Sequence, residues 1–444
     1  NWKIFEYHGG YFEKIKNILK NKTCEARKKR RNKMEYGLIG EHLGHSFSKE
    51  IHQMLGLYQY ELKEVSQDDF DQFMKAKDFK AINVTIPYKE KVIPYLDEIS
   101  PQAKKIKAVN TIVHKDGKLY GYNTDYFGLK DLVESLHIDF TNKKVLILGT
   151  GGTSLTATLV CEDLQMHPII RVSRTKKIDA ISYEEALQTH TDAHLIINTT
   201  PCGMYPNNEA SMIDVKKFPN LEGVVDVVYN PLQTKLVIDA KNNHIKAVGG
   251  LYMLVKQALK ASAIFLNQTI PFQEADIYAK VVQTKQNVVL IGMPSCGKTT
   301  IGKVLAQSLN KEFVDVDEEI EKIIQMEIKD FIINKGETAF RDLEESIIKK
   351  IAKEQNQVIA TGGGSILRSI NVDNLKQNGI IYFLDRSLEQ LIPTTSRPLS
   401  STKEALKQKY KERHELYKKS SDVIIQADGD INTVTNLIKK DYLK

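Results

Sequence analysis

Residues 288–300 read Val-Val-Leu-Ile-Gly-Met-Pro-Ser-Cys-Gly-Lys-Thr-Thr. Residues 292–299 fit the pattern G-x-x-x-x-G-K-[ST], and the apolar run in front predicts a strand that leads into the glycine loop. In such a loop backbone N–H groups cradle phosphates, the lysine reaches the β- and γ-oxygens and the hydroxyl ligates Mg²⁺. The stretch therefore predicts a nucleoside triphosphate site with the candidates Ser295, Cys296, Gly297, Lys298, Thr299 and Thr300.

A second and unrelated phosphate motif lies far upstream, where Val145-Leu-Ile-Leu148 runs into Gly149-Thr-Gly-Gly152. Its glycines permit a tight turn and a close approach of backbone N–H groups to a pyrophosphate at the start of the next helix. Ser154 stands where the usual dinucleotide fingerprint has a third glycine. The two motifs are too far apart for one domain, so the sequence predicts two enzymes joined in one chain.

Length and composition agree with this interpretation. A chain of 444 residues can hold two or three domains, and 41% hydrophobic with 27% charged residues is typical of globular protein. No stretch approaches the roughly 18 apolar residues of a membrane span, and we expect no signal peptide. The cysteines lack metal-ligand spacing. We therefore expect a reduced, cytoplasmic protein without a membrane segment; the four cysteines are Cys24, Cys161, Cys202 and Cys296.

The net charge of +7 comes from the first residues of the chain. Of the 63 Lys and Arg residues, 11 lie in 1–33 beside three Glu; the rest of the chain has 52 against 53 acidic residues, a net of −1. The run Arg27–Arg31 could bind nucleic acid or an anionic surface, but a solvated tail is favoured. We expect 1–33 to be a leader outside any domain, an upstream extension or fragment boundary before Met34.

From Met34 onward, short apolar runs alternate with amphipathic stretches, which is typical of α/β architecture. The expected boundaries fall near 137–143 and 268–286. Strands are expected at 36–40, 145–148, 169–172, 195–197, 224–228, 288–291, 358–360 and 380–383.

The strand after the dinucleotide turn ends in Val172-Ser173-Arg174-Thr175. An NAD-binding unit places Asp or Glu there for the ribose 2′-hydroxyl, whereas a guanidinium suits a 2′-phosphate. Arg174 therefore favours NADP. The alternative is that Arg174 is an ordinary solvated surface residue.

Residues 34–265 resemble shikimate dehydrogenase, and the motifs occur in the order found in that family. They are Gly44-His-Ser-Phe-Ser48, Asn83-Val-Thr-Ile-Pro-Tyr-Lys89, Ala108-Val-Asn-Thr111, Gly121-Tyr-Asn-Thr-Asp125, Asn198-Thr-Thr-Pro-Cys-Gly-Met204, Asp226-Val-Val-Tyr-Asn-Pro231 and Gly249-Gly-Leu-Tyr-Met-Leu-Val-Lys-Gln-Ala258. The resemblance implies reduction of a ring ketone, with Lys89 and Asp125 as the catalytic pair. A lysine beside a carboxylate can act there as general acid or charge stabiliser.

The same resemblance implies the ligand contacts. For the substrate they are Ser46, Ser48, Thr85, Lys89, Asn110, Asp125, Tyr229 and Gln257. For NADP they are Gly149, Thr150, Gly151, Gly152, Thr153, Ser173, Arg174, Thr175, Val227 and Gly250. Ser46 and Ser48 could also cap a helix. Three residues depart from the family pattern without removing a needed group: Lys49 for Pro, Lys107 for Gly and Ser173 for Asn.

Residues 287–444 resemble shikimate kinase, which implies ATP and Mg²⁺ as ligands. In Phe313-Val-Asp315-Val-Asp317 the two carboxylates are two residues apart; the family assigns the first, with Thr299, to Mg²⁺ and the second to the acceptor hydroxyl. Lys298 and Asp317 are the implied catalytic residues. The implied substrate contacts are Asp317, Arg341, Gly363 and Arg413, and Arg397 is implied to contact ATP. Taken alone, Arg413 would be read as a surface charge on a Lys-rich helix.

The lid of the kinase departs from the family pattern. Arg397 is followed by Pro-Leu399, and the stretch 388–396 before it has no Lys or Arg. With one lid cation, stabilisation of the transition state is expected to be weaker.

The expected architecture is α/β: a split substrate-binding domain at 34–140 completed by a helix at 249–268, a Rossmann NADP-binding domain at 141–248, a linker at 269–286, and a P-loop kinase domain at 287–444 with a parallel five-stranded sheet. The expected reactions are NADPH-dependent reduction of 3-dehydroshikimate and ATP-dependent phosphorylation of shikimate. The alternatives are a quinate dehydrogenase that uses NAD, which Arg174 opposes, and a binding protein with one inactive domain. No nucleic-acid or membrane partner is expected, and the sequence does not give an oligomeric state.

Overall fold

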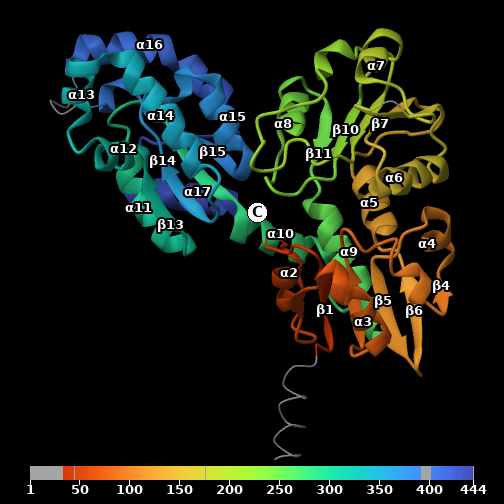
Figure 1. Ribbon diagram of the computed structural model, residues 1–444. Helices are drawn as coiled ribbons and strands as arrows, with labels where there is room; N and C mark the ends of the chain where they lie inside the picture. Colours follow the sequence, from red (N-terminus) through yellow and green to blue (C-terminus); the bar gives the residue numbers. More distant parts are fainter. Residues whose placement is uncertain (1–33, 45, 176, 392–401, 444) are drawn as a thin grey trace, which may run out of the picture. The chain divides into compact units, whose positions relative to one another are not determined.

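The computed structural model describes residues 34–44, 46–175, 177–391 and 402–443, and these form two compact units. One unit comprises the described residues up to Phe127 together with Gln257–Phe272. The other comprises Gly128–Lys256 together with the described residues from Gln273 onward. Helices flank three separate sheets, so the expected α/β class is confirmed (Figure 1).

The first unit contains a six-stranded mixed sheet in the order β2-β1-β3-β5-β6-β4. β1 pairs in parallel with β2 and β3, whereas β5 pairs antiparallel with both β3 and β6. The strands are β1 (Tyr36–Gly40), β2 (Glu61–Glu64), β3 (Ala81–Val84), β4 (Glu98–Ile99), β5 (Thr111–Lys115) and β6 (Lys118–Tyr122). The helices are α2 (Ser48–Leu55), α3 (Gln67–Ala76), η1 (Ile93–Tyr95) and α4 (Pro101–Ile106).

Two further helices, α5 (Asp125–Glu134) and α9 (Leu251–Leu266), contain the first two points at which the chain passes between the units, and the third lies between Phe272 and Gln273.

The second unit contains a parallel five-stranded sheet in the order β11-β10-β9-β7-β8. All four residues of β7 are buried, as expected for a strand that helices cover on both faces. The strands are β7 (Val145–Leu148), β8 (Ile169–Val172), β9 (Leu195–Asn198), β10 (Gly223–Asp226) and β11 (Lys246–Val248). The helices are α6 (Gly152–Asp163), α7 (Tyr183–Thr189), η2 (Val215–Lys217) and α8 (Lys235–Asn242).

The same unit contains a second parallel sheet, in the order β13-β14-β12-β15-β16, so the expected five-stranded parallel sheet is confirmed. The strands are β12 (Asn287–Ile291), β13 (Glu312–Asp315), β14 (Gln357–Ala360), β15 (Gly379–Asp385) and β16 (Val423–Gln426). The helices are α10 (Glu274–Lys285), α11 (Lys298–Leu309), α12 (Val316–Ile324), α13 (Ile328–Lys335), α14 (Glu337–Ile351), η3 (Ser365–Leu367), α15 (Ser369–Asn378), η4 (Leu388–Gln390), α16 (Lys403–Ser420) and α17 (Ile431–Tyr442).

Two details differ from the sequence prediction. The strand expected at 224–228 ends at Asp226, because the Asp226 carboxylate accepts a hydrogen bond from the Val228 N–H (3.0 Å) and turns the chain. The segment expected as a linker, 269–286, contains the helix α10. Among the described residues, no helix is long and apolar enough to cross a membrane.

Candidate active sites

In the first unit, Lys89 and Asp125 form an ion pair. The Lys89 Nζ donates to the Asp125 Oδ2 at 2.5 Å, and the lysine side chain keeps 26% of its surface exposed against 7% for the carboxylate. Lys89 lies in the turn after β3, where its carbonyl accepts from the Val109 N–H (2.8 Å). Asp125 is the first residue of α5. A partly exposed ammonium held on a buried carboxylate can donate a proton, or its charge, to a ligand in front of it.

Asn110 holds the carboxylate in place. Its Nδ2 donates to Asp125 Oδ1 (3.0 Å) and to the Thr124 hydroxyl (3.0 Å), and its Oδ1 accepts from the Thr124 N–H (2.7 Å). Asn83 continues the network, because its Nδ2 donates to the Asn110 carbonyl (3.2 Å). Asn83 and Thr124 stand within two of the quoted family motifs, but no role was predicted for them. Their place in a known motif was the available signal.

The other predicted substrate contacts are distributed over both units. Ser46 Oγ accepts from the Ser48 N–H (3.3 Å), while α2 starts at Ser48 without a side-chain cap, so these serines keep hydroxyl capacity for a ligand. Thr85 follows β3 and is partly exposed, as is Gln257 on α9. Tyr229 belongs to the second unit, where burial raises the pKa of its phenol, which therefore stays neutral.

The dinucleotide turn in the second unit has the geometry that its glycines require. Gly149 has φ 115°, and a Cβ there would lie 2.7 Å from the Thr199 hydroxyl, so only glycine fits. At Gly151 and Gly152 an added Cβ would meet no atom within 4 Å, which leaves room for a phosphate in front of α6. Ser154 is buried and donates to the Gly151 carbonyl (2.7 Å), so it closes the turn where a third glycine was missing.

The residues predicted to recognise the ribose lie just after β8. Ser173 is buried and its hydroxyl accepts from the Thr175 N–H (3.3 Å), whereas Arg174 is exposed and free to meet a ligand phosphate. Elsewhere in this unit, Gly250 donates to the Val228 carbonyl (2.9 Å), and a Cβ there would lie 2.1 Å from the Val227 carbonyl oxygen. This crowding requires a glycine at 250.

The predicted P-loop connects β12 to α11. Gly292 and Gly297 have φ of 151° and 95°, and Ser295 also has positive φ, so the backbone folds back on itself. The Lys298 Nζ donates to the carbonyls of Gly292 (2.9 Å) and Met293 (3.0 Å). Because α11 starts without a side-chain cap, its first N–H groups remain available for phosphate oxygens. The loop fits a nucleoside triphosphate.

The oxygen atoms predicted to hold Mg²⁺ lie together beside this loop. The Thr299 hydroxyl donates to Asp315 Oδ2 at 2.7 Å, and Asp315 Oδ1 accepts from the Asp317 N–H at 3.0 Å, capping α12. Hydroxyl and carboxylate oxygens are the ligands that Mg²⁺ prefers. These residues fit the metal.

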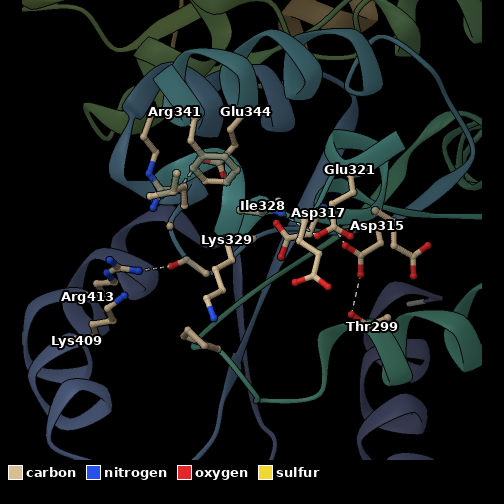
Figure 2. A pocket seen from close by; sticks show the side chains of 18 residues that line it. Thr299, Asp315, Asp317, Glu321, Ile328, Lys329, Arg341, Glu344, Lys409 and Arg413 are labelled. Atoms are coloured by element: carbon tan, nitrogen blue, oxygen red, sulfur yellow. Dashed lines mark hydrogen bonds and ion pairs between the residues drawn. The ribbon is translucent and has the colours of Figure 1, made fainter. Parts of the chain in front are cut away.

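A cavity of about 460 Å³ brings together the predicted acceptor residues (Figure 2). Figure 2 shows Arg413 and Lys409 on one side and Thr299, Asp315 and Asp317 on the other, with Arg341 and Glu344 on a third wall. Gly363 belongs to the glycine-rich loop after β14 that completes the lining. Carboxylates thus gather near the P-loop and cations gather opposite them, which suits a ligand that has both a hydroxyl and a carboxylate.

Arg341 is oriented by Glu344, a residue that the sequence analysis missed. Glu344 is fully buried; its Oε2 accepts from Arg341 (2.7 Å) and its Oε1 accepts from the Ser365 hydroxyl (2.6 Å). Burial lowers the pKa of Arg341, but the charges of Glu344 and Glu337 outweigh it and raise the pKa overall. Glu344 ends the segment Gly336–Glu344 that supplied Arg341, and its place in that segment was the available signal.

Arg413 lies on α16 and is buried, not a surface charge of a Lys-rich helix. It donates to the Gly363 carbonyl at 2.9 Å, and the buried Tyr417 hydroxyl donates to the same oxygen at 2.5 Å. Together they fix the glycine-rich loop against α16.

Two lysines that the sequence analysis did not select also line the cavity, Lys329 on α13 and Lys409 on α16 (Figure 2). Burial lowers the pKa of Lys409 to about 8, and the charges of Arg413 and Arg341 act in the same direction. The packing of α13 and α16 around the cavity brings these lysines to it, and the sequence alone does not show this packing.

The structure places two of the residues that depart from the family pattern, Lys107 and Lys49. Lys107 has φ 58° as the C-cap of α4, a left-handed position that explains why glycine is common there. Lys49 is the second residue of α2. Arg397 and the lid lie outside the described residues.

The two sites define the class of protein: a dinucleotide-dependent oxidoreductase combined with a P-loop kinase. The model of the shikimate dehydrogenase substrate binding domain matches residues 38–112, and the shikimate kinase model matches residues 294–442. The chain is 42% identical over 248 residues to shikimate dehydrogenase (NADP(+)) of Clostridium perfringens strain SM101, covering 52% of this chain and 91% of that relative.

Solved structures are similar to the same part of the chain. Shikimate dehydrogenase 1 of Peptoclostridium difficile is 37% identical, with a TM-score of 0.51 and coverage of 56% of this chain and 97% of that one. A chorismate mutase/shikimate 5-dehydrogenase fusion protein of Clostridium acetobutylicum is 35% identical, with a TM-score of 0.52 and coverage of 56% and 97%. The chain belongs to the shikimate dehydrogenase family and carries a shikimate kinase domain in addition.

Proposed function

We propose that this chain is a bifunctional enzyme that reduces 3-dehydroshikimate to shikimate with NADPH and phosphorylates shikimate to shikimate 3-phosphate with ATP. One observation carries the proposal. In the described residues the Lys89 Nζ lies 2.5 Å from an Asp125 carboxylate oxygen, while Thr299 of the P-loop is hydrogen-bonded to Asp315, which in turn accepts from the Asp317 N–H. The product of the first reaction is the acceptor of the second.

NADPH supplies the hydride for the reduction, and the turn at Gly149–Gly152 with Arg174 would hold it. Lys89 would give its proton or its charge to the oxygen that becomes an alkoxide, and the Asp125 carboxylate orients the Lys89 Nζ (2.5 Å). Asn110 fixes the Asp125 carboxylate so that the pair keeps its geometry as charge moves. The serines at 46 and 48, Thr85, Tyr229 and Gln257 would bind the hydroxyls and the carboxylate of the ring.

In the kinase, ATP supplies the phosphoryl group, and Thr299 with Asp315 would hold the Mg²⁺ that neutralises its charge. Asp317 lines the cavity beside the P-loop and would accept the hydrogen bond, and then the proton, of the attacking hydroxyl. Arg341 and Arg413 would grip the substrate carboxylate on the opposite side of the cavity. Lys298 would stabilise the charge on the transferred group.

A coupled assay tests the proposal. The chain is given 3-dehydroshikimate, NADPH and ATP·Mg²⁺, and shikimate 3-phosphate is measured by mass spectrometry. Omission of ATP should leave shikimate, and omission of NADPH should leave the ketone unchanged. Parallel reactions with quinate and NAD distinguish the alternative dehydrogenase, which would turn over that pair faster than shikimate and NADP.

A further inference from the structure

Two buried amide side chains at the end of α15, Gln377 and Asn378, have partners outside the kinase portion of the chain (residues 287–444). Each is 1% exposed. Burying an amide without hydrogen bonds costs stability, so such groups are retained where a partner satisfies them. Here the partners belong to the dinucleotide-binding portion (residues 141–248), in the same compact unit.

Gln377 pairs with the dinucleotide-binding portion in both directions. Its Nε2 donates to the Asn208 carbonyl (3.0 Å), and its Oε1 accepts from the Asn208 side-chain amide. Its own backbone carbonyl accepts from the Gln233 N–H (2.8 Å). Asn208 is also buried, at 2% exposure. These three hydrogen bonds fix the distance between α15 and the dinucleotide-binding portion and determine which residues face each other.

Asn378 contacts both portions at once. Its Oδ1 accepts from the Leu232 N–H (3.1 Å), while its Nδ2 donates to the Tyr205 hydroxyl (2.9 Å) and to the Ala352 carbonyl at the end of α14 (3.1 Å). This buried amide therefore links the end of α14 in the kinase portion to Tyr205 and Leu232 of the dinucleotide-binding portion.

Charged pairs surround these buried amides. Glu209 pairs with Lys349 at 2.6 Å, with both side chains 41% exposed, and Lys235 pairs with Asp373 at 3.5 Å. A buried centre with a polar, partly hydrated rim is the anatomy of a specific protein interface.

We propose that α15 of the kinase portion is a docking element for the dinucleotide-binding portion, so that the two move as one body. Of the contacted segments, 205–209 lies within the loop after β9, and 232–235 leads from the loop after β10 into α8. The second starts three residues after Tyr229, and the Thr234 hydroxyl links it to β10 by donating to the buried Asp226 carboxylate (2.6 Å). The kinase therefore supports the backbone that positions Tyr229, and the partner of this surface is the chain's own kinase portion.

Hydrogen exchange on the full chain, followed by mass spectrometry, tests the docking. Gln377→Ala should accelerate exchange about tenfold in 201–210 and 230–240, the effect of losing one or two buried amide hydrogen bonds. Asn208→Ala, changed on the other side, should do the same in 369–378. The double variant should exchange little faster than either single variant, because both substitutions remove the same Gln377–Asn208 hydrogen bond. The control is Lys376→Ala, whose side chain pairs with Asp422 inside the kinase portion (3.5 Å) and should leave 201–210 unchanged.

Either of two results would overturn the proposal. Unchanged exchange in 201–210 and 230–240 in Gln377→Ala, with phosphorylation of shikimate retained as the folding check, would show that the two portions move independently. Exchange that depends on protein concentration would assign the contact to a second copy. If Gln377→Ala fails to fold, the comparison rests on Asn208→Ala, which alters no residue of the kinase portion.

Discussion

The replacement Lys89→Met removes the ammonium of the Lys89–Asp125 pair and keeps most of the side-chain volume. We expect kcat for 3-dehydroshikimate reduction to fall by about 10²–10⁴-fold, the usual contribution of a positioned acid or base. Phosphorylation of added shikimate should stay within about twofold of wild type, because the residues predicted for that reaction lie in another domain with its own core.

The same change lowers stability by an amount that the structure bounds. The Asp125 side chain, 7% exposed, loses its cationic partner, but the Asn110 amide (3.0 Å) still donates to its other oxygen. Because Lys89 keeps 26% of its side-chain surface in water, the loss should be about 1–3 kcal/mol and not that of a fully buried pair. Thermal melting checks this.

The matched control is Lys91→Met, two residues further on, where an exposed lysine donates to Gln67 Oε1 (3.1 Å) and lies over the Tyr88 ring (5.9 Å). It should keep both activities. The converse variant is Asp317→Asn, which should abolish phosphorylation and spare the reduction. The two-enzyme reasoning fails if a folded Lys89→Met chain loses the kinase, or if it still reduces the ketone at more than a tenth of the wild-type rate.

Three further predictions concern single side chains. Arg174→Ala should weaken NADPH binding by about tenfold or more and leave NADH binding nearly unchanged, because it removes a charge-assisted contact; equal losses for both cofactors in a titration would assign Arg174 to structure. Burial holds the pKa of Lys409 at about 8, below its unfolded value, so its charge is lost as pH rises through 8. The KM for shikimate should therefore rise between pH 7 and 9 in wild type and stay flat in Lys409→Met; parallel profiles would contradict this. Lys107→Gly should stabilise the protein by about 0.5–1 kcal/mol in urea unfolding, since Lys107 has φ 58°, whereas Lys105→Gly inside α4 should destabilise it.

The strands and phosphate loops were predictable because their signals are local. Val145–Leu148 and Val288–Ile291 are apolar runs that end in glycines, and the structure places strands and turns at both positions. The strand expected to reach 228 was wrong by two residues because its end depends on a side-chain bond, from the Val228 N–H to the Asp226 carboxylate. The pattern of apolar residues does not indicate where a side-chain hydrogen bond ends a strand.

The roles of Glu344 and Lys409 were not predictable for a similar physical reason. Glu344 acquires its role from Arg341 on its own helix and from Ser365, which lies in a different segment. Lys409 reaches the cavity through the packing of α16 around the glycine-rich loop. A charged residue on a helix reads as solvated until tertiary contacts bury it, so the sequence favours the wrong interpretation at such positions.

The two reactions can be independent although the kinase portion docks on the dinucleotide-binding portion, because catalysis and docking depend on different residues. The pair Lys89–Asp125 belongs to the first unit, whereas the α15 contacts reach the backbone next to Tyr229 in the second. Loss of the docking contacts should therefore disturb the binding of substrate and cofactor, and loss of Lys89 should disturb the chemical step. On this reasoning Gln377→Ala raises the KM of the reduction with little change in kcat. Lys89→Met lowers kcat with little change in KM. Steady-state kinetics on the two variants separate these effects, and a Gln377→Ala chain that loses kcat at unchanged KM would show that the docked loops act on catalysis and not on binding.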